Sequence, residues 1–255
     1  MSQIHPTAII EEGVELGAGC TVHAHAILRR GTVLAERVTV HPFAVVGGDP
    51  QDLRFDPATL SGVRIGAGTT LREYVTVSRS TQPGGTTAVG DNCYLMAACH
   101  VAHDCVVGNQ VVVANAVLLA GHVHIGDHCF LGGAAGVHQF VRVGEGAMIS
   151  GASRVAQDVP PFGMAAERNQ VIGLNLVGLK RRGVARESIR EVKEAFRIVY
   201  FTAGNIREVA AQALASNLFC TTEARRFLEF FLSGKRGFAR ARREGPAAES
   251  RAEES

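Results

Sequence analysis

Aliphatic residues recur at every sixth position along most of this chain. One run steps from Ile4 to Val46, and the longest steps without a break from Val89 to Val155. A helix repeats its buried positions every ~3.6 residues and a half-buried strand every second residue, so neither produces this period. A hexapeptide period is typical of a parallel β-helix, in which three hexads close one triangular coil. We therefore expect a mainly β protein whose aliphatic positions fill the interior of a prism.

The position four residues after each aliphatic is usually small or mid-sized. Five of the six cysteines occupy it, namely Cys20, Cys93, Cys99, Cys105 and Cys129. Cysteine away from reactive surroundings behaves as a small buried hydrophobe. No CxxC pair occurs in the chain. We interpret these cysteines as packing residues rather than as zinc ligands or disulfide partners.

Composition excludes some classes of partner. The 255 residues carry a formal net charge of +2, which gives no reason to expect binding to nucleic acid or to a charged membrane surface. No apolar run approaches the ~18 residues of a membrane-spanning helix, and no secretory signal opens the chain. The sequence therefore predicts a cytoplasmic protein with no membrane insertion and no nucleic-acid partner.

The regular period divides the chain into parts. Residues 1–160 are expected to form the β-helix, with segments 47–64 and 79–88, rich in Gly, Pro and polar residues, protruding from it. The period stops at "AQDVPPFG", a proline-marked boundary. Residues 161–240 are predicted to form a small α-helical C-terminal domain. Residues 241–255 are charged and polar and are expected to be a disordered tail.

Three stretches of the C-terminal part have helical patterns. In "RESIREVKEAFRIVYF", apolar residues recur on one face of a helix. The stretches "NIREVAAQALAS" and "TEARRFLEFFLSG" read as two further helices. We therefore expect at least three helices packed together after the β-helix.

The stretch "HVAHDCVVGN" brings histidines onto outward positions of the predicted coils. Successive coils lie about 4.8 Å apart, so residues 18 apart in sequence stack. His103 is thus expected next to Gly121, and Asp104 next to His122. Three further polar residues fall within a coil or so of this column: His100, His138 and Gln139.

This cluster allows two chemical interpretations beyond a plain polar surface. A carbonic anhydrase family with similar hexads binds zinc through three histidines, but it separates two ligands by four residues, a spacing that these histidines do not have. The other interpretation is a general base, because an imidazole suits proton transfer near neutral pH. Asp104 could orient His103, and the Gly121 amide could stabilise an oxyanion. This combination favours acyl transfer to a hydroxyl, with no metal and no cofactor.

Several motifs carry a resemblance to a known family. The stretches "NQVVVANAVLLAGHVHIGDHCFLGGAAGVHQF", "AHDCVVGN", "VAQDVPP" and "GLKRRG" resemble the UDP-N-acetylglucosamine 3-O-acyltransferases of lipid A synthesis, and the resemblance covers nearly the whole chain. It implies a left-handed β-helix. It also implies transfer of an (R)-3-hydroxyacyl chain from acyl carrier protein to the 3-hydroxyl of UDP-N-acetylglucosamine. Members are homotrimers with active sites between neighbouring prisms, so a homotrimer is expected here.

The resemblance also implies roles for individual residues. His103 matches the catalytic base, Asp104 its orienting carboxylate and Gly121 the oxyanion donor. The positions that match substrate-binding residues are Asp52, Arg54, His100, His122, His138, Gln139, Asn175 and Arg181. Lys180 and Arg182 are expected to face the acidic carrier protein.

Gly151 matches a position at the end of the acyl groove, where residue size sets the chain length. A glycine there predicts a preference for longer chains, although Arg168 could intrude on the same groove and shorten it.

The chain departs from the family pattern at two positions of the nucleotide and substrate contacts. Arg54 stands where the family usually has lysine, and Val177 stands where it has glutamate. The motifs leave open whether the acceptor carries a 3-hydroxyl or a 3-amino group. The related N-acyltransferase of the same pathway carries an extra domain before its hexads, whereas the hexads here begin at Ile4, so that reading ranks lower.

Overall fold

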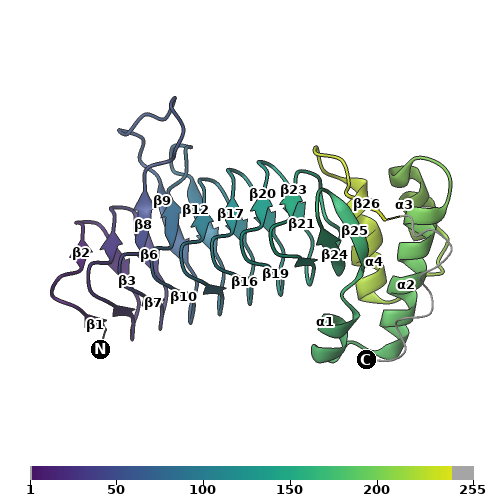
Figure 1. Cartoon of the computed structure of the whole chain (residues 1–255), viewed down its shortest axis with the longest axis horizontal. Helices are drawn as coiled ribbons and strands as arrows, with labels where there is room; N and C mark the ends of the chain where they lie inside the picture. Colours follow the sequence, from purple (N-terminus) through teal and green to yellow (C-terminus); the bar gives the residue numbers. More distant parts are fainter. Residues whose placement is uncertain (1, 243–255) are drawn as a thin grey trace.

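The computed structural model describes residues 2–242 as a long prism of short strands followed by a group of helices (Figure 1). The strands form three sheets, one for each face of the prism. The first face contains β1 (Gln3–Ile4), β4 (Thr21–Val22), β7 (Thr39–Val40), β10 (Thr70–Leu71), β13 (Tyr94–Leu95), β16 (Val112–Val113), β19 (Phe130–Leu131) and β22 (Met148–Ile149). The second contains β2 (Ile9–Ile10), β5 (Ile27–Leu28), β8 (Val45–Gly48), β11 (Thr76–Ser78), β14 (His100–Val101), β17 (Leu118–Leu119), β20 (Gly136–Val137) and β23 (Arg154–Val155). The third contains β3 (Glu15–Leu16), β6 (Thr32–Leu34), β9 (Gly62–Ile65), β12 (Thr86–Val89), β15 (Val106–Val107), β18 (His124–Ile125) and β21 (Arg142–Val143).

Within the prism, successive strands on the same face pair in parallel, one coil apart. From β12 to β23 the register advances by 18 residues, as in the pairs of His100 with Leu118 and of Leu118 with Gly136. This is the parallel β-helix expected from the hexads, with the left-handedness that the family resemblance implied, and that prediction is confirmed. The disordered tail was expected from residue 241, but Ala241 lies in a short strand, so that start is wrong; residues 243–255 lie outside the described residues.

The interior of the prism contains the residues that the six-residue period selected. All of the aliphatics of the period from Val22 to Val155 are buried, whereas Ile4, in the first coil, is 48% exposed. The five cysteines of the small position are buried and free of disulfides, and Cys220 in the helical part is exposed. The interpretation of these cysteines as packing residues is confirmed for the described structure.

The two expected excursions are shorter than their sequence composition suggested. The first lies between the end of β8 at Gly48 and the start of β9 at Gly62, and it projects from the prism in Figure 1. The second lies between β11 and β12. Arg79 joins them: its guanidinium donates to Asp49 Oδ1 at 2.9 Å and to Pro57 O at 2.8 Å. Charge-assisted hydrogen bonds from one largely covered arginine to several acceptors help to hold a loop in one geometry.

The β structure continues beyond the expected boundary near residue 160. After Val155 the chain forms β24 (Gly163–Ala166) and β25 (Gln170–Leu174), an antiparallel pair that extends the first sheet. The short β26 (Arg240–Ala241) then pairs with β25. The sequence pattern predicted only helices here, because these strands do not follow the six-residue period.

The helical part contains α1 (Leu176–Arg181), α2 (Arg186–Phe201), α3 (Ile206–Ala215), α4 (Thr222–Glu229) and the 3₁₀ turn η1 (Phe230–Leu232). Three of these helices, α2, α3 and α4, lie where the sequence placed them. The apolar faces of the helical part share a core that includes Val192, Phe227 and Phe231. No helix among residues 2–242 is long and apolar enough to cross a membrane.

A buried ion pair fastens the helical part to the end of the prism. Arg142 Nε donates to Asp158 Oδ2 at 2.8 Å, and the Asp158 side chain is 1% exposed. The same guanidinium donates to Ser233 Oγ at 2.7 Å and packs over the Phe230 ring. Asp158 also accepts a backbone hydrogen bond from Ala239. One arginine thus connects the last coil to the segment after α4.

We predict that Asp158→Asn destabilises this junction, because it leaves the Arg142 charge without its carboxylate. Breaking a buried pair typically costs ~3–5 kcal/mol, and partial hydration of Arg142 reduces our expectation to about 2 kcal/mol. Urea unfolding measures the loss. The matched control is Glu145→Gln, which breaks the more exposed pair between Glu145 and Arg226 and should cost less than about 1 kcal/mol. Equal losses in the two variants would contradict the special role of Asp158.

Candidate active site

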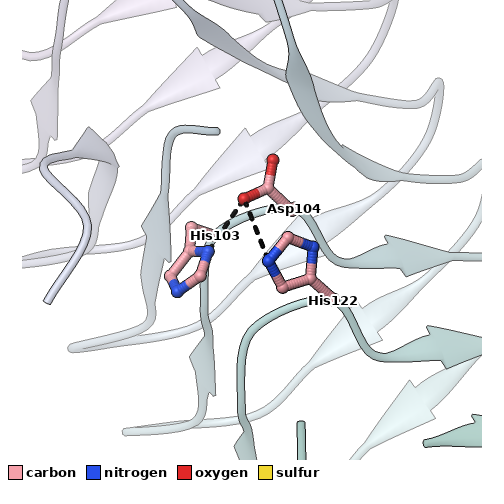
Figure 2. Close-up of side chains that lie close together, drawn as sticks. All are labelled: His103, Asp104 and His122. Atoms are coloured by element: carbon pink, nitrogen blue, oxygen red, sulfur yellow. Dashed lines mark hydrogen bonds and ion pairs between the residues drawn. The ribbon is translucent and has the colours of Figure 1, made fainter. Parts of the chain in front are cut away.

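His103 and Asp104 form a hydrogen-bonded pair at a corner of the prism (Figure 2). The two residues follow β14, and Asp104 Oδ2 lies 2.8 Å from His103 Nδ1. Asp104 has a φ of 60°, which is the left-handed conformation found at one residue of nearly every corner, and aspartate tolerates it better than most residues. The turn at Asp104 thereby places its carboxylate beside the imidazole of His103.

Asp104 is held as an anion by donors from the second excursion. Its carboxylate accepts hydrogen bonds from the hydroxyls of Ser80 and Thr81 and from the Thr81 backbone N–H at 3.2 Å. Burial alone would raise the pKa of the Asp104 carboxyl, but the hydrogen bonds from Ser80, Thr81 and His103 outweigh it and hold the pKa at about 2. An ionised carboxylate only accepts, so His103 donates through Nδ1–H and keeps an acceptor lone pair on Nε2.

The His103 ring lies against Gly121, as the stacking of residues 18 apart predicted. A Cβ added to Gly121 would lie 2.5 Å from His103 Cε1 and 2.6 Å from Nε2, so any other residue would collide with the ring. Among residues 2–242, the Gly121 N–H donates to no protein acceptor. A free amide therefore lies beside the basic nitrogen.

His122 lies on the other side of Asp104. Its Nε2 is 3.7 Å from Asp104 Oδ2, and its ring stacks on Phe140 with 4.6 Å between ring centroids. Burial lowers the pKa of His122, and the Asp104 carboxylate offsets part of that shift. His100 lies in β14, three residues before His103. It hydrogen-bonds through Nδ1 to Thr76 Oγ1 at 2.7 Å, and burial lowers its pKa too.

A groove of about 640 Å³ runs from His103 along the second face of the prism. Its floor is largely apolar, with Leu118 and Ala120 near the histidines and Gly136 and Ala156 farther along. The remaining polar residues that line it are Gln51, His100, His138, Gln139, Arg154 and Arg168. An apolar floor with a few convergent polar groups is typical of a small-molecule site.

His103, Asp104 and His122 lie close enough together to hold a metal ion. One ligand atom from each of His103, Asp104 and His122 lies within 4.8 Å of the others. A zinc site needs nitrogen ligands at ~2.0–2.1 Å with their lone pairs directed at the ion. Here the carboxylate is satisfied by Ser80, Thr81 and the Nδ1–H of His103, so the hydrogen bonds account for the cluster without a metal.

The remaining expected site residues of the prism do not line this groove, although Gln51, the neighbour of Asp52, does. Asp52 accepts from the Arg54 backbone N–H at 3.0 Å, and this hydrogen bond, partly offset by burial, lowers the pKa of Asp52. Arg54 extends into solvent with its side chain 92% exposed. Gly151 is in the turn after β22, at a different corner from His103. None of the three lines the groove of a single chain.

The residues expected to hold the nucleotide and the carrier protein lie on or near α1. Asn175 caps this helix: its Oδ1 accepts from Gly178 N at 2.9 Å and its Nδ2 donates to Gly146 O at 3.0 Å. Lys180 and Arg181 are exposed. Arg182 instead packs over the Phe162 ring, and its Nη2 is buried with no hydrogen-bond partner in the described structure.

Sequence reasoning missed Ser80 and Thr81 as partners of Asp104. They lie in a segment outside the six-residue period, so no fixed offset linked them to the histidine cluster. It also missed Leu118, Gly136 and Arg154, although all three fall on the column 18, 36 and 54 residues after His100 and could have been found by extending it.

Comparisons with known proteins agree with this geometry. Residues 158–239 match the family model described as UDP N-acetylglucosamine O-acyltransferase, domain 2. A Campylobacter jejuni protein named acyl-[acyl-carrier-protein]–UDP-N-acetylglucosamine O-acyltransferase is 43% identical, and the alignment covers 93% of this chain and 96% of the relative. A Myxococcus xanthus protein of the same name is 42% identical over 78% of this chain and 77% of its own length.

The chain belongs to this O-acyltransferase family. It is therefore an acyltransferase. The solved structure of UDP-N-acetylglucosamine acyltransferase from Campylobacter jejuni superposes with a TM-score of 0.82 at 36% identity, covering 94% of this chain and 100% of that one. The structure of LpxA from Acinetobacter baumannii superposes with a TM-score of 0.84 at 31% identity, covering 94% of this chain and 98% of that one.

The low pKa of Asp104 predicts a defined pH dependence of stability. The folded-state pKa lies below the unfolded value of about 3.9, so the contribution of Asp104 is complete above that value and is lost as the pH falls toward about 2. We expect the unfolding free energy of the wild type to fall more steeply than that of Asp104→Asn between about pH 5 and pH 3. Urea unfolding at several pH values measures both slopes.

The control is Asp56→Asn, in the first excursion, which should keep the slope of the wild type. Parallel curves for the wild type and Asp104→Asn would show that the carboxylate is not held as described.

Proposed function

We propose that this chain transfers an (R)-3-hydroxyacyl group from acyl carrier protein to the 3-hydroxyl of UDP-N-acetylglucosamine, the first step of lipid A synthesis. The names of its relatives support these substrates. The observation that carries the proposal is the position of His103, between an ionised carboxylate on one side and a free backbone amide on the other. Both substrates are water-soluble, and we propose a cytoplasmic location.

The proposed reaction uses these groups in order. His103 Nε2 removes the proton of the sugar hydroxyl, whose oxygen attacks the thioester carbonyl. The Gly121 N–H donates to the oxyanion that forms, and Asp104 stabilises the imidazolium. The intermediate then collapses, the carbon–sulfur bond breaks, and the proton on Nε2 passes to the departing thiolate. The products are the 3-O-acyl sugar nucleotide and the free thiol of the carrier protein.

We further propose that the complete site lies between chains of a homotrimer. Asn175, the N-cap of α1, and Arg181, at the end of that helix, do not line the groove that contains His103, so one chain alone does not bring them to a substrate in that groove. A neighbouring chain would supply them, with Asp52 and Arg54 contacting the substrate from the first excursion. Of the two residues proposed to face the carrier protein, Lys180 is exposed and Arg182 is largely packed against Phe162.

Replacing His103 with Ala should lower turnover by about 10²–10⁴-fold, which is the usual contribution of a general base. Mass spectrometry of the product formed from UDP-N-acetylglucosamine and hydroxyacyl carrier protein measures it. The 3-amino analogue of the acceptor is assayed in parallel, because an imidazole base would serve either nucleophile.

The matched control is His124→Ala, which removes an exposed histidine from the third face and should leave turnover near that of the wild type. Activity is also measured after exhaustive EDTA treatment. Near-normal turnover of His103→Ala, or loss with EDTA that only zinc restores, would overturn the proposed mechanism.

Gly151 is proposed to set the acyl chain length. A long side chain at this position would fill space at the end of an acyl groove, and each methylene displaced from an apolar site forfeits ~0.8 kcal/mol, or roughly fourfold in preference. We therefore expect Gly151→Met to shift preference toward shorter chains. Competition among hydroxyacyl carrier proteins of several lengths measures the shift. An unchanged length profile would exclude Gly151 as the determinant and direct attention to Arg168, which lines the groove itself.

A further inference from the structure

The segment after the last helical turn returns to the groove and contacts one of its histidines. Arg236 follows η1, and its Nη2 lies 2.8 Å from Nδ1 of His138, a residue 98 positions earlier in the chain. His138 follows β20 and lines the groove that contains His103. The C-terminal part of the chain thus places one cation against the wall of the candidate active site.

Arg236 is held in this position from both sides. On one side, Ser233 receives hydrogen bonds from Arg142 at its hydroxyl and its carbonyl. On the other side, Asp158 N donates to Gly237 O at 2.9 Å and Ala239 N donates to Asp158 O at 2.9 Å. The backbone around Arg236 is therefore fixed to the last coil by the junction described above. Its Nε is buried and makes no hydrogen bond within residues 2–242. The polar contact with His138 is made by Nη2, at the other end of the guanidinium.

The chemistry of the contact determines where His138 carries its proton. A guanidinium has donors only, so Nδ1 of His138 must accept, and a neutral ring that accepts at Nδ1 carries its hydrogen on Nε2. Donation from Nδ1 to the Gln139 carbonyl, 3.4 Å away, would need the opposite tautomer and is the longer contact. The Nε2 atom of His138 has no hydrogen-bond partner in the described structure.

We infer that Arg236 is a positioning residue that fixes His138 as a hydrogen-bond donor, with Nε2–H available to an oxygen of the acceptor substrate. His103 has the reverse arrangement, because Asp104 holds its Nδ1–H and leaves Nε2 as an acceptor. Two histidines of one groove thus have opposite roles: one takes a proton, and the other donates a hydrogen bond. That the recipient is a sugar-nucleotide oxygen rests on the proposed function, whereas the tautomer rests on the contact alone.

The first test is NMR of protein labelled with ¹⁵N in its histidine rings. His138→Gln identifies the signals of His138 by their loss. The wild type should show His138 as the Nε2–H tautomer, and Arg236→Ala should show a mixture of tautomers or a shift toward Nδ1–H. Arg236→Lys, which can still donate, should keep most of the wild-type pattern. Arg240→Ala, which removes a nearby exposed arginine, should leave it unchanged. An unaltered His138 tautomer in Arg236→Ala would overturn the inference, whether or not the protein proves active on UDP-N-acetylglucosamine.

The second test is kinetic and separates positioning from structural support. Arg236→Ala should raise the KM for the acceptor about tenfold with a smaller change in kcat, and Arg236→Lys should recover part of the loss. In a His138→Gln background the same substitution should have little further effect, because the pair acts as one unit. An equal loss in both backgrounds would show that Arg236 acts through folding rather than through His138. Failure of the wild type to acylate the acceptor would count against the proposed function and leave the NMR result to decide the role of Arg236.

Discussion

Backbone hydrogen bonds between successive coils determine where the functional side chains of the prism lie. His122 N donates to His103 O at 3.0 Å, and Phe140 N donates to Gly121 O at 3.2 Å. Each bond joins residues 19 positions apart and so brings positions that are 18 apart next to each other in consecutive coils, one strand spacing of ~4.8 Å away. The chemistry of this corner therefore depends on which residue type occupies it in consecutive coils, and here the order is His103, Gly121 and Gln139.

The same register explains why a glycine follows the histidine in this column. Gly121 does not have the positive φ that favours glycine elsewhere, so its backbone conformation would accept other residues. The space beside it would not, because the His103 ring occupies the position where a Cβ would lie. Glycine leaves room for the ring and also exposes its N–H next to Nε2. One small residue thereby permits both the proposed base and the proposed oxyanion donor.

The parts of the structure with a regular period, six residues in the prism and about 3.6 in α2, α3 and α4, could be predicted from the sequence, and the parts without one could not. The buried aliphatics, the packed cysteines and the contact of His103 with Gly121 all follow from a fixed offset of six or 18 residues. Ser80 and Thr81 lie in an excursion whose length has no relation to the period, so their hydrogen bonds to Asp104 have no signature in spacing. The strands β24 and β25 were missed for the same reason. The contact of Arg236 with His138 could not be predicted either, because it depends on how the helices pack.

The groove and its surroundings contain several histidines, and their neighbours distinguish the one suited to be a base. His100 bonds to a neutral hydroxyl, and burial lowers its pKa. His122 lies 3.7 Å from the Asp104 carboxylate, beyond a good hydrogen bond, and burial lowers its pKa as well. His138 is hydrogen-bonded at Nδ1 by the Arg236 guanidinium, which is a donor, rather than by a carboxylate. Only His103 has an ionised carboxylate at 2.8 Å to stabilise the imidazolium that forms when a hydroxyl loses its proton. The assignment of the base therefore rests on the charges around each ring, since all four imidazoles are chemically alike.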